Sequence, residues 1–358
     1  MTAKKIIMYC KKLTYQNYRN IESAEINLDG GVNVLYGNNA QGKTNLLEGI
    51  YYFACGKSFR SATDKELIRM GSDYGSVSID FSDGQRDRCH EVRFFRNDRK
   101  ICLKEGIKIS RMSDFIGVFR AVLFSPEHLS IVKEGPAERR NFCDIAISQL
   151  YPAYMASLSK YKKLLQHRNA VLKDEEGPTS DGMIEVLSAE LAREAAFIAA
   201  YREKYVCKLS SYVSDIISDM TCGREKAELF YPLAADESEY MRLLTSNVRK
   251  ERYAGTTLYG IHKDDVKVTL NGNDSRVYAS QGQQRSIALA MKLAEGEISK
   301  DDTGEYPVFL FDDILSELDK TRKEYILSKL GSRQVIITCC EDIPMGKIFT
   351  VSNGSICM

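Results

Sequence analysis

The sequence predicts an α/β fold built around a phosphate-binding loop, with a mainly helical second region inserted into it. Three observations lead to this expectation. A glycine-bounded loop at 37–44 lies between an apolar strand and an amphipathic helix. A second apolar strand, at 307–311, ends in two carboxylates. Between about 127 and 254, strand-like alternation gives way to helical periodicity.

The loop reads Gly37-Asn38-Asn39-Ala40-Gln41-Gly42-Lys43-Thr44, which is G-x4-G-K-T, the P-loop pattern. Glycines at both ends let successive backbone N–H groups face a phosphate. The N-terminus of the following helix adds free N–H groups and a partial positive charge. Lys43 is expected to reach the β- and γ-phosphates, and the Thr44 hydroxyl to hold Mg²⁺. The pattern therefore predicts a nucleoside triphosphate site.

Composition bounds the class of protein. The 358 residues are 44% hydrophobic and 28% charged, as in soluble globular proteins, and suffice for one large domain with an insertion or for two domains. The net charge of +1 means that any nucleic-acid surface is a local patch. Apolar runs fall short of the ~20 residues of a membrane span, and the start lacks a signal peptide's features. The ten scattered cysteines favour a reduced, cytoplasmic protein.

Short strands dominate the part of the chain before residue 127. We expect strands at 6–13, 24–28, 75–81, 89–96, 100–103 and 121–124, and a short helix at 64–70. The polar segment 17–20 admits two interpretations: it is a hairpin connection, or it brings Arg19 near the nucleotide. The first lobe is therefore expected to span 1–126.

The inserted lobe is expected at 127–254. Helices are predicted from 135 onward, with apolar residues at three- and four-residue spacing over 149–173 and 184–220, and a break at 175–182. A strand at 228–232 and a helix at 237–251 complete it. These helices are too short for a long coiled-coil arm.

The α/β lobe is expected to resume at 255–358. Strands are predicted at 255–259 and 266–270, with a turn at 271–273, and Ser280 is placed to cap a helix at 286–298. The buried strand at 307–311 would place Asp312 where a P-loop protein holds Mg²⁺. A helix through 330, a core strand at 334–338 and a final edge strand at 348–351 follow.

Three motifs follow one another along the chain. They are a P-loop, then an S-x-G-Q sequence before a helix, and then an apolar strand that ends in Asp-Asp and is followed by S-x-L-D. This combination resembles the ABC-type ATPases, and within their SMC-like branch it is most similar to the RecF family. The segments GKSFR, FSPEHLSIVKEGPAERRNFCD, HKDD, SQGQQRS and FDDILSELD carry the resemblance over nearly the whole chain. It implies an ABC-type P-loop ATPase head, a mixed sheet with helices, bearing an inserted helical lobe.

The resemblance also implies roles for individual residues. The nucleotide set would be Gly37, Asn38, Asn39, Ala40, Gln41, Gly42, Lys43, Thr44 and Asn45, with Ser280, Gly282 and Gln283 as a signature motif closing over the ATP of a second subunit. Thr44 and Asp312 would hold the metal, and Lys43, Asp312 and Asp313 would be catalytic. Asp313 would polarise the attacking water, or it is a second carboxylate of the metal shell. Residues 316–319 would form the D-loop at the dimer seam.

Three departures from the wider ABC pattern predict slow hydrolysis. Asp313 stands where those ATPases usually have the longer Glu, and Cys339 where they often have a switch His. Ser125, Pro126 and Glu127 occupy the join to the insertion, where no glutamine is evident. Each change weakens the positioning of water, whose geometry tolerates little error. We therefore expect a weak, DNA-stimulated ATPase that is used as a switch.

By resemblance, the protein would bind ATP and Mg²⁺, form an ATP-dependent homodimer and bind DNA at single-strand gaps and junctions without sequence preference. It would work with RecO and RecR proteins in RecA loading, replication, recombinational repair and the SOS response. Candidate DNA contacts are Lys57, Arg60, Arg139, Arg140, Lys160, Lys162 and Lys163, although a solvated basic face explains each equally well. The rival functions are a nucleotide-binding subunit of a membrane transporter and a small-molecule P-loop kinase.

Overall fold

The fold is taken from a computed structural model that describes residues 8–174, 180–232, 234–331, 333–341 and 345–357. The chain divides into two compact units. The first comprises residues 1–130 and 285–358, and the second comprises residues 131–284. Each unit is described by itself.

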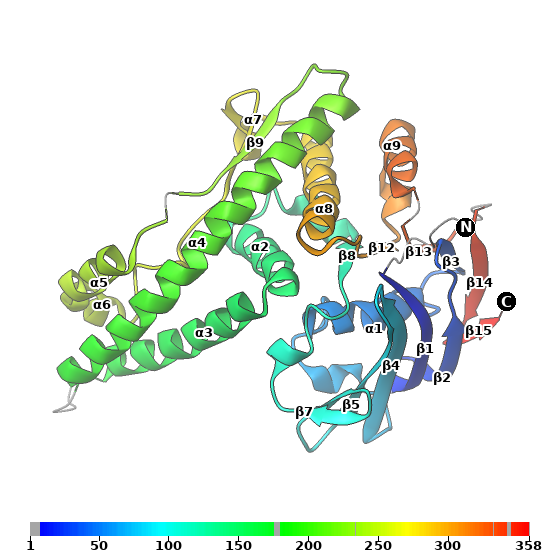
Figure 1. Cartoon of the computed structure of the whole chain (residues 1–358), viewed down its shortest axis with the longest axis horizontal. Coiled ribbons are helices and arrows are strands. Elements are labelled where there is room, and N and C mark those ends of the chain that lie inside the picture. The colour runs from blue at the N-terminus through cyan, green and yellow to red at the C-terminus, as the bar shows by residue number, and fades with distance from the viewer. Residues whose placement is uncertain (1–7, 175–179, 233, 332, 342–344, 358) are drawn as a thin grey trace. The chain divides into compact units, whose positions relative to one another are not determined.

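A six-stranded, mostly parallel sheet forms the centre of the first unit (Figure 1). Its order is β15 (Ser355–Cys357), β14 (Lys347–Ser352), β3 (Val32–Tyr36), β13 (Val335–Cys339), β12 (Val308–Asp312) and β8 (Ala121–Phe124). Only β15 is antiparallel to its neighbour. Every residue of β8, β12 and β13 is buried, which explains their unbroken apolar runs. The strands expected at 121–124, 307–311 and 334–338 are confirmed.

The second sheet of this unit is antiparallel. It comprises β2 (Ile21–Asn27), β1 (Met8–Tyr18), β4 (Tyr74–Asp83), β5 (Asp87–Phe95), β6 (Ile101–Lys104) and β7 (Ile107–Ile109), in that order. Buried positions tend to alternate along β2 and β5, as expected where one face packs on the core. The turn at Arg19 and Asn20 confirms a hairpin connection between β1 and β2.

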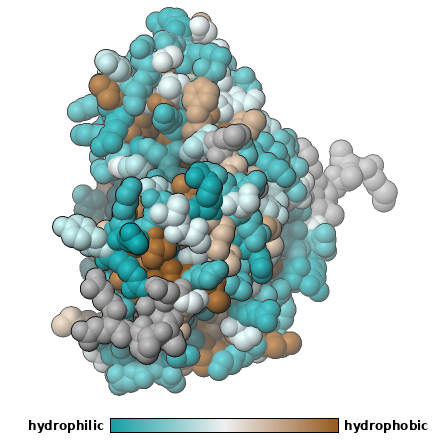
Figure 2. All heavy atoms as spheres, turned by 90° about the vertical axis from the view of Figure 1, so that its left-hand side faces the viewer, coloured by the Kyte–Doolittle hydropathy of each residue, from teal (hydrophilic) through white to brown (hydrophobic). Residues whose placement is uncertain are grey.

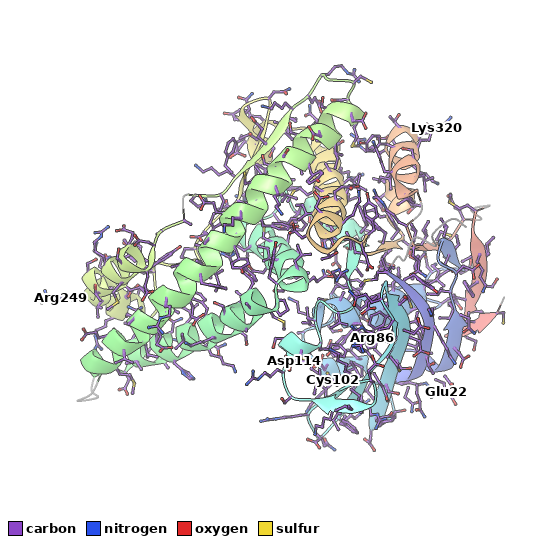
Figure 3. All side chains as sticks on the ribbon, in the orientation of Figure 1. Glu22, Arg86, Cys102, Asp114, Arg249 and Lys320 are labelled. Carbon is purple, nitrogen blue, oxygen red and sulfur yellow. The ribbon has the colours of Figure 1, made fainter. Side chains whose placement is uncertain are left out.

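Helices complete the first unit. The helix α1 (Lys43–Cys55) follows the glycine-rich loop, and α9 (Lys320–Leu330) connects β12 to β13. The helix α8 (Gln281–Thr303), which belongs to this unit from Arg285 onward, precedes β12. Lys320, the first residue of α9, is labelled in Figure 3. Short 3₁₀ turns are η1 (Asp64–Leu67), η2 (Met112–Asp114), η3 (Pro126–Ser130) and η4 (Ile314–Glu317).

The second unit is mainly helical. It contains α2 (Pro136–Leu150), α3 (Pro152–Lys173), the 41-residue α4 (Ser180–Met220), α5 (Glu237–Ser246), α6 (Val248–Ala254) and α7 (Ser275–Tyr278). A small antiparallel sheet joins β9 (Ala227–Phe230), β10 (Lys267–Leu270) and β11 (Asn273–Asp274). In Figure 1, α3 and α4 run side by side. Their interface encloses the fully buried Arg168, whose guanidinium donates to the carboxylate of Glu251 over 2.6 Å.

The structure corrects the predicted boundary at 254/255, because the second unit extends to Gln284. Residues 267–270 pair with β9, and this pairing holds them in the helical unit. The strand expected at 255–259 is wrong. Gly255 instead ends α6 at φ 62°, and Thr257 gives both its N–H and its hydroxyl to Asn169.

Other predicted elements are broken or extended. The helix expected at 149–173 breaks at Tyr151, because Pro152 starts a new helix, and the one at 237–251 breaks at Asn247. The predicted helix at 64–70 is only the 3₁₀ turn η1. The strand at 348–351 is not the sheet edge, since β15 lies outside it. The break expected at 175–182 falls largely outside the described residues.

The polar character of the surface is consistent with the 28% content of charged residues. The face drawn in Figure 2 is mostly hydrophilic, with apolar side chains in small patches. Among the helices that the structure describes, none combines the length and the apolar character needed to span a bilayer.

His90 gives the fold a sensitivity to acid. The side chain is fully buried in the first unit, stacks on the Phe115 ring at 5.0 Å between centroids, and has no partner for either ring nitrogen. Burial lowers the pKa of His90 from 6.5 to about 4. As the pH falls, the unfolded chain therefore binds this proton before the folded chain does. The contribution of neutral His90 to the free energy of unfolding is fully present above pH 6.5 and is lost as the pH drops toward 4.

We predict that His90→Phe removes part of this loss. Between pH 7 and pH 4, the free energy of unfolding in urea should fall by about 3 kcal/mol less in the variant than in the wild type. At pH 8, where the native histidine is neutral, the two proteins should be similarly stable. Identical pH profiles for both proteins would show that His90 is not a source of acid sensitivity.

Candidate functional site

The glycine-rich loop lies at the carboxyl end of β3, and α1 begins at its last residues. Gly42 has φ 110°, a conformation open mainly to glycine, and leads directly into the helix. The Lys43 ammonium folds back over the loop and donates to the carbonyls of Gly37 at 2.6 Å and Asn38 at 3.0 Å. The expected strand, loop and helix are confirmed, with the free N–H groups of a helix start next to a lysine.

A second set of groups comes from β12 and β13. The Thr44 hydroxyl donates to Asp312 Oδ1 at 2.8 Å, and the Thr338 hydroxyl donates to the same oxygen at 3.0 Å. Burial raises the pKa of Asp312, and the nearby Asp313 raises it further, while the two hydroxyl donors oppose the rise. A divalent cation beside this carboxylate would oppose the rise and favour its charged form.

Thr44 and Asp312 suit Mg²⁺. Both present hard oxygen atoms, and Mg²⁺ in phosphate sites takes few protein ligands and completes its shell with water and phosphate. Among the described residues, no group of three or more His, Cys, Asp and Glu side chains could hold a metal by itself. This pair is therefore the natural protein contribution to a metal-phosphate site.

A pocket of about 330 Å³ opens over the loop. Its lining belongs entirely to the first unit: Asn20, Asn39, Ala40, Gln41, Gly42, Lys43, Thr44, Asn45, Arg60 and Asp313. Asp313 follows β12 in the left-handed conformation, at φ 49°, and its N–H donates to the Thr338 hydroxyl. The structure thus brings Asp313 to the same pocket as Lys43 and Thr44.

Two pocket residues were not assigned to the nucleotide by the sequence analysis. Asn20 accepts a hydrogen bond from Asn45 Nδ2 at 2.8 Å, although the sequence placed it only in a turn. Arg60, a candidate DNA contact, donates to Asn45 Oδ1 at 2.9 Å and lines the pocket. The only sign in the sequence that could have suggested a place for Arg60 in the pocket is its position in a short polar segment after the P-loop helix.

Two adjacent cysteines, Cys339 and Cys340, lie at the end of β13 and differ in their surroundings. Cys339, expected at the place of a switch histidine, is the buried end of β13. The next residue, Cys340, is exposed, and its sulfur lies 3.1 Å from Lys43 Nζ and 2.9 Å from Asn39 Oδ1. The sequence pattern did not show which of these two adjacent cysteines would be buried and which would contact the phosphate loop.

Arg19 forms an ion pair with Glu48 of the helix that follows the phosphate loop. Its guanidinium donates to both carboxylate oxygens of Glu48, at 2.8 and 2.7 Å, and Glu48 is fully buried in α1. The Ser58 hydroxyl also donates to Glu48, at 2.5 Å. Arg19 is not among the residues that line the pocket, and its guanidinium is paired with α1.

The signature residues lie at the start of α8, in the second unit. The Gln283 N–H donates to Ser280 Oγ at 3.3 Å, and the Ser280 N–H donates to Gln283 Oε1 at 2.8 Å. This reciprocal pair is a capping box, so the expected cap is confirmed. Gly282 lies within this first turn, and Gln283 Nε2 also donates to Glu225.

Several candidate DNA contacts have partners within the protein. Arg139 is buried and forms a two-pronged ion pair with Asp265, at 2.8 and 2.9 Å. Arg140 donates to the backbone of Asp264, and Lys160 pairs with Glu190 at 2.6 Å. The sequence could not reveal these pairs, because their partners are distant in the chain.

Fold and site together define an ABC-type P-loop ATPase head. A family model described as "RecF/RecN/SMC N terminal domain" matches residues 9–351. The Smc head domain of Pyrococcus furiosus shares the fold, with a TM-score of 0.59, 18% identity and coverage of 98% of this chain and 95% of that one.

Two closer matches narrow the class. A Clostridium novyi (strain NT) protein named "DNA replication and repair protein RecF" is 41% identical, over 98% of this chain and 99% of its own length. The solved structure of "the recombination mediator protein RecF-ATP in RecFOR pathway" has a TM-score of 0.92 and 35% identity, covering 99% of each chain. This chain belongs to the RecF family.

The Arg19–Glu48 pair yields a stability prediction. Arg19→Met should lower the free energy of unfolding by about 3 kcal/mol, because it leaves a buried carboxylate unpaired. Adding Glu48→Gln should restore much of this loss. Urea unfolding provides the measurement, and Arg69→Met is the matched control.

Arg69 pairs with Glu22, whose side chain is 75% exposed, so losing that pair should cost no more than about 1 kcal/mol. Equal losses in the Arg19 and Arg69 variants would contradict the proposed role of the buried pair.

Proposed function

We propose that this protein is an ATP-dependent DNA-binding switch of recombinational repair. The observation that carries the ATP site is the 2.8 Å contact between Thr44, in the phosphate loop, and Asp312, at the end of a buried parallel strand. It unites the two halves of a metal-phosphate site. The DNA function is supported by family membership and by the names of the two close relatives.

ATP binding would use the loop from Gly37 to Asn45. The N–H groups at the start of α1 would contact phosphate oxygens, and Lys43 would exchange its carbonyl partners for the β- and γ-phosphates. Thr44 and Asp312 would hold Mg²⁺. Arg60 reaches the same pocket and adds a positive charge on the side of Asn45.

Hydrolysis would be slow and would serve to end the bound state. Asp313 lines the pocket and is the carboxylate proposed to polarise water. Its short side chain, on a backbone fixed at φ 49°, restricts where that water can lie. An ATP-bound complex would therefore persist, and turnover would release it.

ATP would close two copies into a dimer. One chain carries one phosphate loop and one signature segment, Ser280 to Gln283, so a two-fold pair would enclose two ATP molecules. The capping box leaves the N-terminus of α8 well formed, and a helix N-terminus stabilises a multiply charged anion. Residues 316–319 would lie at the seam.

The proposed DNA target is a single-strand gap or a junction of single- and double-stranded DNA, without sequence preference. RecO and RecR proteins are the proposed partners, in a pathway that loads RecA and supports replication and the SOS response. The solved relative is itself described as a recombination mediator of the RecFOR pathway. We place the protein in the cytoplasm, where its DNA substrate and these partners would lie.

The central prediction concerns coupling between ATP and DNA. At one fixed salt concentration, gapped DNA should bind tightly with ATP and at least about tenfold more weakly with ADP or without nucleotide. Lys43→Met, which removes the phosphate contact, and Ser280→Arg, which blocks the proposed dimer contact, should both abolish the ATP effect. Fluorescence anisotropy of a labelled gapped duplex measures it. DNA affinity that is indifferent to nucleotide would remove the proposed switch.

A second prediction separates the two roles open to Asp313. If it positions water, Asp313→Asn should reduce the single-turnover hydrolysis rate by about 100-fold or more while ATP affinity stays within about threefold. Asp312→Asn should instead weaken Mg²⁺-ATP binding as well. If Asp313→Asn weakens Mg²⁺-ATP binding as strongly as Asp312→Asn does, Asp313 is a second metal-shell carboxylate.

A further inference from the structure

The last two strands of the chain are joined by a tight turn at Asn353 and Gly354. Both residues are left-handed, at φ 49° and 75°, and Ser352 pairs with Ser355 across the turn. These are the features of a type I′ hairpin turn, which favours the sequence Asn-Gly. In such a turn, the N–H groups of the two central residues are free to donate elsewhere.

Both of these N–H groups donate to one residue of the phosphate loop. The Asn353 N–H donates to the side-chain oxygen Oε1 of Gln41 at 2.7 Å. The Gly354 N–H donates to the backbone carbonyl of the same residue at 2.9 Å. The turn therefore holds Gln41 by its side chain and by its backbone at once.

The hairpin packs so closely against the β1–β2 turn and the phosphate loop that a side chain is excluded both at Gly354 and at Gly37. A Cβ at Gly354 would lie 2.6 Å from the carbonyl oxygen of Asn20, and a Cβ at Gly37 would lie 2.3 Å from the carbonyl oxygen of Val351 in β14. The C-terminal hairpin thus contacts the phosphate loop at its first glycine and again just before its second one.

The contact with the Gln41 carbonyl has a consequence for the next residue. A peptide unit is planar and trans, so the carbonyl of Gln41 and the N–H of Gly42 point in opposite directions. Fixing that carbonyl against the turn fixes the direction of the N–H group of Gly42, a residue that lines the pocket. Asn20 Nδ2 approaches the same carbonyl at 3.3 Å and acts in the same sense.

We propose that the Asn353-Gly354 turn is a positioning device for nucleotide binding, which pre-orients the Gln41–Gly42 peptide of the phosphate loop. This inference rests on the proposed ATP site and adds to it a determinant more than 300 residues away in the sequence, where no nucleotide motif is present. A loop already held in its binding conformation loses less free energy in ordering when ATP arrives.

The chain supplies a matched control for this proposal. Asn271 and Gly272 also form an Asn-Gly turn, at φ 50° and 81°, between β10 and β11. A Cβ at Gly272 would meet no atom within 4 Å. Asparagine tolerates the left-handed conformation, so Gly→Asn strains both turns alike, but only Gly354→Asn collides with a neighbouring backbone.

The experiment measures Mg²⁺-MANT-ATP affinity of the full-length chain, together with urea unfolding. Gly354→Asn should weaken binding by about tenfold, and Gly272→Asn should change it by less than about twofold. Gln41→Met, which removes only the side-chain acceptor, should weaken binding by about threefold to tenfold. Because both substitutions act on the junction between the turn and Gln41, the double variant should lose less than the product of the two single effects.

The outcomes distinguish failure of the positioning role of the turn from failure of the proposed ATP site. Affinity that is unchanged in both Gly354→Asn and Gln41→Met would overturn the positioning role while leaving the ATP site intact. An equal loss of affinity in Gly272→Asn would overturn it too, since general destabilisation would then explain the effect. A wild-type chain that does not bind MANT-ATP would overturn the ATP site itself and this inference with it.

Discussion

The parallel pairing of β13 with both β3 and β12 is the constraint on which the site depends. Carboxyl ends of parallel strands meet at one edge of a sheet, so the phosphate loop after β3 and Asp312 at the end of β12 arrive there together. Thr338, inside β13, completes the link by donating to Asp312 and by accepting from the Asp313 N–H. A shift of one residue in the register of β13 would turn the Thr338 hydroxyl to the other face of the sheet and break both hydrogen bonds.

Polar contacts from outside the motif then hold the loop in place. Glu48 fixes α1 to the β1–β2 turn through Arg19, while the C-terminal hairpin fixes Gln41 from another direction. Glu48 is fully buried, where an unmatched polar group is costly, and Gly354 is in close contact with neighbouring backbone. The conformation of the loop is therefore maintained by these neighbours as well as by the hydrogen bonds from Lys43 to the carbonyls of Gly37 and Asn38.

Elements with an unbroken apolar run or a rigid motif were predictable from the sequence, as β8, β12, β13 and the loop before α1 show. Short edge strands were not: β7 and β15 have three residues each, and their pairing depends on a neighbouring strand. The phosphate-loop residues and Asp312 followed from local spacing. Asn20, Arg60 and Cys340 did not, since their places in the site arise from contacts across the fold. The strand expected at 255–259 failed because Thr257 is held by side chains of α3 rather than by a strand partner.

The segment His262–Asp265 is held by contacts within the helical unit. His262 contacts the Tyr161 hydroxyl at 2.7 Å, and burial lowers the pKa of this histidine to about 4, so it is neutral in the folded protein at pH 7. Asp265 binds the buried Arg139, while Asp264 accepts from Tyr231 and lies 3.8 Å from Arg202. Removing Asp265 would leave the buried Arg139 guanidinium without its carboxylate partner, which is costly. Arg139 is thereby committed to the interior of the helical unit, and a DNA phosphate would have to displace Asp265 to reach it. Basic side chains outside these buried pairs are therefore the better candidates for DNA contact.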